Sequence, residues 1–113
     1  MSWPEFYILV DRLPVAVDVL TWGKWFGANE RHVGDDKIGN VRVSTVFLGL
    51  NHRFPRSSTD EPLLFETLVF GGPLDGEMDR YSTWAEAERG HAEVVVKVRK
   101  AAAQIKAIKD NVR

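Results

Sequence analysis

The first part of the chain alternates short apolar runs with turn-forming residues, a pattern typical of β-strands. Residues 6–10 form a run of aromatic and β-branched side chains, and residues 15–17 form a shorter run after a polar turn at 11–14. From Asp18 to Phe26, apolar side chains recur at spacings of three and four, and Asp18 can cap the free amides of a first turn. We therefore expect two strands followed by a short Trp-rich helix.

The middle of the chain predicts further strands joined by recognisable turns. Residues 32–38 and 41–50 flank a Gly-Asn pair, which indicates a two-residue hairpin because glycine accepts the positive φ that such turns need. The second of these runs is apolar on both faces, as in a central strand covered on both sides. Residues 63–70 predict the next strand, and residues 78–81 a brief last one.

A long helix is predicted from about residue 83 to residue 110. Thr83 and Glu86 have the spacing of a capping box, in which the two side chains satisfy each other's backbone amides. Apolar residues then recur at alternating spacings of three and four, which is a heptad seam. The members of this seam are Trp84, Ala87, His91, Val94, Val98, Ala101, Ile105 and Ile108.

Together these elements predict one α+β domain over residues 1–113. The domain is expected to contain an antiparallel sheet of about four to six strands. The short Trp-rich helix and the long C-terminal helix pack on that sheet. The long helix would measure about 40 Å, whereas a domain of this size has a radius of gyration of about 13–14 Å. We therefore expect its distal turns to extend past the sheet and a second copy of the chain to cover them.

This reasoning predicts a homo-oligomer, a dimer or larger. The expected interface residues are Val94, Val98, Ala101, Ile105 and Ile108. The alternative is a monomer in which the helix lies diagonally across its own sheet and frays after Ala103.

Composition narrows the function classes. The chain is 44% hydrophobic and 27% charged, as in ordinary globular proteins, and no apolar run approaches the ~20 residues of a membrane span. Residues 94–113 hold six basic residues and one acid, but the net charge is -1, so we expect neither a membrane nor a nucleic-acid partner. The chain has no cysteine and no signal-peptide pattern, which favours the cytoplasm.

Three segments, VSTVFLGLNH (43–52), PLLFETLVFGG (62–72) and RYSTWAEAERGH (80–91), carry a resemblance to a known family. The chain resembles a widespread group of small proteins encoded by tailed phages and prophages, in which Asp often stands where this chain has Asn51. The resemblance implies a phage-derived accessory protein in the cytoplasm of the host cell. Such proteins act against host defences, by sequestering a signalling nucleotide or by blocking a host defence protein. The family supplies no catalytic residues to transfer.

A loop and a strand end carry the residues best suited to hold an anion. Residues 51–59 combine two guanidinium groups, hydroxyls and an aromatic ring, and Arg80 and Tyr81 lie just before a helix N-terminus, which favours anions. The candidate residues for a nucleotide-like ligand are His52, Arg53, Phe54, Arg56, Glu66, Arg80 and Tyr81. The alternative is a plain surface loop, with Glu66 paired to an arginine such as Arg42 or Arg80.

His52, Glu66 and His91 are the residues most able to move a proton or bind a metal. None of the usual metal-ligand spacings is present, so we expect no metal and no cofactor. His91 lies on the helix seam and is expected to be packed and hydrogen-bonded. The main hypothesis is thus a non-enzymatic binding protein. The alternatives are a small enzyme using His52 with Glu66 or Arg80, and a structural or assembly component of a virion.

Overall fold

The computed structural model describes residues 3–51 and 61–112. It has the expected α+β architecture, with antiparallel strands divided between a four-stranded and a two-stranded sheet. In chain order the elements are β1 (Tyr7–Val10), β2 (Leu13–Ala16), α1 (Val19–Ala28), β3 (His32–Ile38), β4 (Val41–Phe47), β5 (Phe65–Phe70), β6 (Met78–Tyr81) and α2 (Trp84–Asn111).

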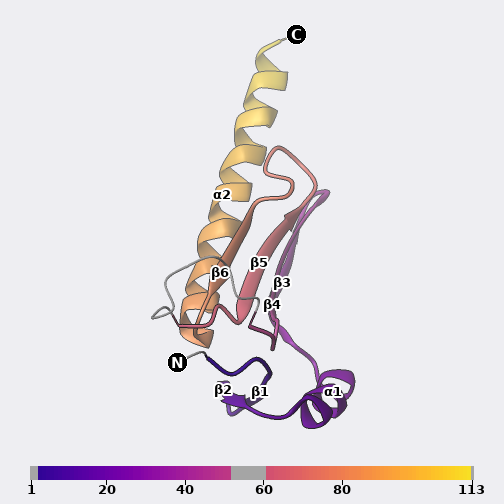
Figure 1. The fold of residues 1–113 in the computed structure, drawn as a ribbon. Helices are drawn as coiled ribbons and strands as arrows, with labels where there is room; N and C mark the ends of the chain where they lie inside the picture. The colour runs from indigo at the N-terminus through magenta and orange to yellow at the C-terminus, as the bar shows by residue number, and fades with distance from the viewer. Residues whose placement is uncertain (1–2, 52–60, 113) are drawn as a thin grey trace.

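The larger sheet has the strand order β3-β4-β5-β6, and α2 lies along one of its faces (Figure 1). Alternation along the strands decides which side chains α2 covers, because successive residues point to opposite faces. Inward positions of β4 and β5 face each other in register, as in the pairs Thr45↔Thr67 and Phe47↔Phe65. The central place predicted for β4 is confirmed, but its second face is covered only in part, because Ser44 is buried while Arg42 is exposed.

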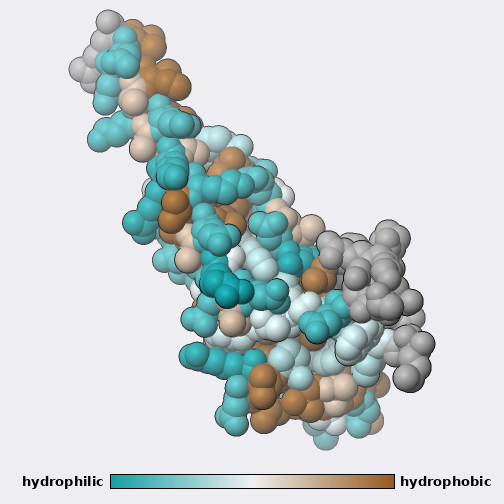
Figure 2. Space-filling view, turned by 90° about the vertical axis from the view of Figure 1, so that its left-hand side faces the viewer, coloured by the Kyte–Doolittle hydropathy of each residue, from teal (hydrophilic) through white to brown (hydrophobic). Residues whose placement is uncertain are grey.

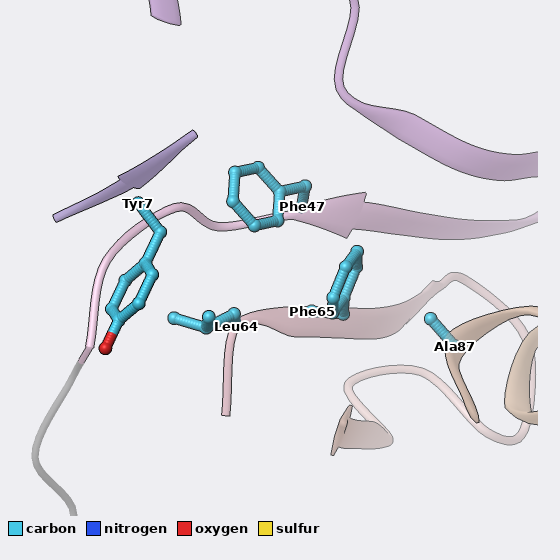
Figure 3. Close-up of a cluster of buried hydrophobic side chains, with 5 residues drawn as sticks. All are labelled: Tyr7, Phe47, Leu64, Phe65 and Ala87. Atoms are coloured by element: carbon cyan, nitrogen blue, oxygen red, sulfur yellow. The ribbon is translucent and has the colours of Figure 1, made fainter. Parts of the chain in front are cut away.

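The interior between the sheet and α2 consists of two apolar clusters. The lower cluster in the orientation of Figure 1 comprises Tyr7, Phe47, Leu64, Phe65 and Ala87 (Figure 3). The upper cluster comprises Val41, Val43, Val69, Val94 and Val98. Thr45, Thr67 and His91 occupy the inward positions between the two clusters, so a polar layer divides the core.

The N-terminal module, formed by β1, β2 and α1, lies at the lower end of the sheet (Figure 1). The turn between its strands has only two residues, Asp11 and Arg12, and both adopt positive φ, at 50° and 68°. Helix α1 begins at the expected cap, where Asp18 accepts a hydrogen bond from the Thr21 amide at 2.8 Å. It continues two residues past the predicted end, to a point where the Asn29 side chain donates to the Trp25 carbonyl.

Helix α2 extends well beyond the sheet. Its capping box at Thr83 and Glu86 is present as predicted, and its last fully buried residue is Val98. The helix then continues to Asn111 instead of fraying after Ala103. The molecule is therefore elongated, with extents of 60 × 33 × 19 Å and a radius of gyration of 16.9 Å. Among the described residues, no helix has both the length and the apolar character that a membrane crossing would need.

Candidate functional site

The structure brings together two of the predicted ligand-binding residues, Glu66 and Arg80. They are cross-strand neighbours on β5 and β6, on the sheet face that α2 does not cover. The Nε and Nη2 atoms of Arg80 each lie 2.9 Å from Oε2 of Glu66, and the two side chains are only 15% and 16% exposed. Of the two arginines predicted as partners of Glu66, Arg80 forms the ion pair. Arg42 pairs with Asp35 instead.

Tyr81, the next residue along β6, points to the opposite face of the sheet. Its ring packs against Gly90 of α2, where any side chain would collide with it. Burial raises the pKa of the Tyr81 hydroxyl above its ordinary value of 10.0. Arg80 and Tyr81 therefore do not line a common pocket.

The other four predicted ligand-binding residues, His52, Arg53, Phe54 and Arg56, lie outside the described residues. The loop half of the predicted anion site, and the enzyme hypothesis that depends on His52, therefore stay predictions.

A chain of four polar side chains runs from the surface into the core. Nε2 of His91 lies 2.6 Å from Oδ2 of Asp36, and Nδ1 lies 2.7 Å from the Thr45 hydroxyl, which in turn lies 2.5 Å from the Thr67 hydroxyl. The prediction that His91 is packed and hydrogen-bonded is confirmed. The backbone of Gly34 lies directly against the His91 ring, where a Cβ atom would come within 2.7 Å of it.

These four hydrogen-bonded side chains include the residue types of a nucleophile–base–acid triad, but their geometry does not suit catalysis. Thr45 is completely buried, so no substrate can reach its hydroxyl. The hydrogen bonds among these side chains instead satisfy polar groups that would be costly to bury without partners. They also join α2 to β3, β4 and β5 at a fixed position. We interpret it as a structural layer of the core.

Sequence reasoning missed three members of this layer: Asp36, Thr45 and Thr67. Each lies far along the chain from His91, so no local spacing connects them. One signal was present in the sequence. Gly34 interrupts a predicted strand, where glycine is unfavourable and marks a close approach of another group; in the structure that group is the His91 ring.

The part of α2 beyond Val98, residues 99–111, is named here the α2 overhang. Val94 and Val98, predicted as interface residues, are packed against the chain's own sheet in the upper cluster. The remaining three predicted interface residues are accessible: Ala101 is half-buried, Ile105 is 37% exposed and Ile108 is 62% exposed. Figure 2 shows apolar side chains along one edge of the overhang, with hydrophilic side chains beside them.

A small apolar notch opens where the overhang begins. Its walls come from α2, from the start of β4 and from the loop between β5 and β6. The lining residues are Val41, Gly71, Pro73, Leu74, Val98, Ala101 and Ala102. Its volume of about 20 Å³ is far too small for a nucleotide.

A second apolar surface lies at the other end of the molecule. Figure 2 shows apolar side chains gathered at the lower end, where the N-terminal module lies. The N-terminal apolar surface comprises the exposed side chains of Trp3, Val10, Leu13, Val15, Val19 and Leu20. Pro14 lies within β2 and lacks an amide hydrogen, which disfavours regular strand addition at that edge. Any partner would therefore contact side chains of this surface.

Within residues 3–51 and 61–112, no three His, Asp or Glu side chains lie close enough together to hold a metal ion. Comparisons with protein-family models, with curated proteins and with solved structures found no match for this chain.

Proposed function

We propose that this chain is a phage- or prophage-encoded accessory protein that acts by binding, in the cytoplasm of the host cell. Its target in this proposal is a host defence protein, which it blocks by contact through the N-terminal apolar surface.

The exposure of large apolar side chains on the N-terminal module carries the proposal. Leu13 is 67% exposed and Leu20 is 76% exposed, and helix α1 has no buried residue at all. Scattered exposed apolar residues are ordinary, but a gathered group of this kind marks an interaction surface in most monomeric proteins. Burying a leucine side chain contributes roughly 2 kcal/mol, so two such residues can anchor a protein partner.

The described residues favour a protein target over a nucleotide signal. Glu66 already engages the Arg80 guanidinium through two nitrogens, so a phosphate would have to displace a half-buried carboxylate. The notch beside α2 is apolar and smaller than a nucleotide. Sequestration of a nucleotide therefore becomes an outcome that the experiment must separate from protein binding.

The test expresses the chain in bacteria that each carry one defence system and measures plaque formation by a sensitive phage. We expect the wild-type chain to restore plaques against at least one system. The double variant Leu13→Asp, Leu20→Asp should lose this effect, because two charges would oppose burial of the surface. Val96→Asp is the matched control, since Val96 is half exposed on α2, far from the module.

Two further measurements decide the mode of action. Purified chain should form a complex with the purified component of the system that it inhibits, and the double variant should not, while circular dichroism shows both chains folded. If a cyclic or linear nucleotide raises the melting temperature of the wild-type chain and of the double variant equally, the target is a nucleotide and not a protein. Failure of the wild-type chain to restore plaques against every system would overturn the counter-defence proposal.

A further inference from the structure

We propose that the peptide bond between Asp75 and Gly76 is a latent modification site, at which isoaspartate forms when the loop between β5 and β6 opens. In the folded chain, the hydrogen bonds of this loop keep the site closed. The site is independent of the proposed function, because its chemistry involves one loop of this chain and no partner.

The reaction needs only the chain itself and water. The backbone nitrogen of Gly76 attacks the side-chain carboxyl carbon of Asp75, and a C–N bond forms. The amide proton and the hydroxyl of the protonated carboxyl group leave as one water molecule, which gives a five-membered succinimide ring. Water then adds to the ring, and opening at the backbone carbonyl leaves isoaspartate, in which the main chain runs through the side-chain carbons.

The sequence offers this reaction one favourable place. Glycine permits the attack best, because it has no Cβ atom to obstruct the approach of its nitrogen. Asp75–Gly76 is the one Asp-Gly pair of the chain, and the sequence has no Asn-Gly pair, which would react in the same way. Both residues are exposed, so water reaches them.

The folded loop engages both reacting groups with other partners. Oδ1 of Asp75 accepts a hydrogen bond from the Gly71 amide at 2.6 Å, and the Gly76 amide donates to the Val69 carbonyl at 2.9 Å. Val69 is 1% exposed and belongs to the upper cluster, so the second bond is anchored in the core. Formation of the succinimide ring requires both hydrogen bonds to break, and therefore requires the loop to open.

The backbone of the loop explains why the chain carries this reactive pair. Gly76 has a φ of 84°, which residues with a side chain rarely adopt, so the turn needs glycine there. Position 75 needs a short side chain that accepts from the Gly71 amide, and aspartate supplies it. The turn thus requires two residues whose combination isomerises readily, and the same turn restrains the reaction.

Isomerisation would undo the turn that restrains it. One methylene group passes from the side chain of Asp75 into the backbone, and the shortened carboxylate no longer matches the Gly71 amide. The loop also contacts α2, because Leu74 packs against the upper cluster and the Glu77 carboxylate lies 3.0 Å from Nζ of Lys97. Isoaspartate in this loop would therefore loosen the contact between the loop and α2.

The first test compares the folded chain with the same chain unfolded in guanidinium chloride, at one near-neutral pH and one temperature. Peptide mapping with electron-transfer fragmentation locates isoaspartate and measures its rate of formation. We expect at least tenfold slower formation at Asp75 in the folded chain. Asp79 is the internal control, because an arginine follows it, and it should form little isoaspartate in either state.

Two results of this comparison would contradict the proposal. Equal rates at Asp75 in the folded and the unfolded chain would overturn the restraint by the loop. An unfolded chain that forms no more isoaspartate at Asp75 than at Asp79 would overturn the site itself.

The second test loosens the loop without removing a hydrogen-bond donor. Pro73 has no amide hydrogen, and Pro73→Gly makes the loop more flexible. We expect isoaspartate to form at Asp75 several times faster in this folded variant. Pro14→Gly is the matched control, because it makes the same change in β2, and it should leave the rate unchanged. Equal acceleration by both variants would mean that global unfolding, and not opening of the loop, exposes the site.

The third test uses Asp75→Asn, whose side-chain oxygen can still accept from the Gly71 amide. The ring then forms with loss of ammonia, and water converts it into products whose mass differs from that of the starting amide. We expect this deamidation to be at least tenfold slower in the folded variant than in guanidinium chloride. Equally fast deamidation in both states would show that the hydrogen bond of the Gly76 amide does not restrain the reaction.

Discussion

The two halves of α2 share one heptad seam but have different surroundings. From Trp84 to Val98 the seam is buried against the sheet, and from Ala101 to Asn111 it is accessible. The sheet sets this limit. Strand β4 has seven residues and spans about 23 Å, which matches the ~22 Å of the first fifteen residues of α2. Periodicity therefore indicates which face of a helix is apolar, while the length of the neighbouring strands decides how much of that face is covered.

The largest expected effect in the buried half comes from Gly90→Ala. Helix propensity alone would make this change stabilising by about 1 kcal/mol, but the new methyl group would come within 2.2 Å of the Tyr81 side chain and collide with it. We expect a net loss of about 1–3 kcal/mol in the free energy of unfolding, measured by urea denaturation. Gly23→Ala in α1 is the matched control, because nothing lies within 4 Å of its Cβ position, and it should stabilise slightly. A stabilised Gly90→Ala variant would show that the contact between α2 and β6 is loose.

The next effect compares the two halves directly, through Val98→Ala and Ile108→Ala. Val98 is 3% exposed, and removal of two buried methyl groups should cost about 2 kcal/mol. Ile108→Ala should change the stability of the monomer by less than about 0.5 kcal/mol. Both values come from chemical denaturation at sub-micromolar concentration, where self-association is absent. Equal losses would mean that the overhang folds back onto its own sheet.

The start of the buried half depends on its cap. The Thr83 hydroxyl accepts a hydrogen bond from the Glu86 amide at 3.1 Å, and the Glu86 carboxylate accepts one from the Thr83 amide at 3.1 Å. Thr83→Ala removes the first bond and should cost about 1 kcal/mol, seen as a lower denaturation midpoint. Thr83→Ser keeps the hydroxyl and should restore most of the loss. A Thr83→Ala chain as stable as wild type would place the anchoring of α2 entirely in its packing.

The smallest expected effect is a loss of folding stability at alkaline pH. Burial raises the pKa of both tyrosines, Tyr7 and Tyr81, above 10.0 in the folded chain. The unfolded chain would lose these protons first, so the stabilisation is complete below about pH 10 and is lost as the pH rises through the folded values. Absorbance of tyrosinate at increasing pH should show both groups ionising above 10, and Tyr81→Phe should reduce the fall in stability. Ordinary ionisation of Tyr81 would contradict its tight packing on α2.

Local patterns were enough to predict most elements of the fold. The heptad seam and capping box indicated α2, and the Gly39–Asn40 turn indicated the β3–β4 hairpin. Each of these patterns involves residues that are close together in the sequence. The end of β4 was predicted three residues too late. Gly49 adopts positive φ there, and its backbone lies against Trp22 and Phe26, a contact between segments that no local pattern contains.

The candidate sites were less predictable for the same physical reason. The pairing of Glu66 with Arg80 depends on strand register, and the ring of His91 meets a carboxylate that is 55 residues away. The split of the seam into a covered and an accessible half depends on strand length, which the sequence indicated only to within a few residues. Val94 and Val98 were therefore grouped with Ile105 and Ile108, although the sheet covers the first pair.

The polar layer in the core also has a direction. A carboxylate can only accept, so Nε2 of His91 donates to Asp36; a ring that carries its proton there accepts at Nδ1 from Thr45, which leaves Thr45 to accept from Thr67. Each hydroxyl has one proton to donate, so the direction of each hydrogen bond is fixed by the one before it. Loss of the Asp36 carboxylate would therefore alter the partners of two buried hydroxyl groups that it does not touch.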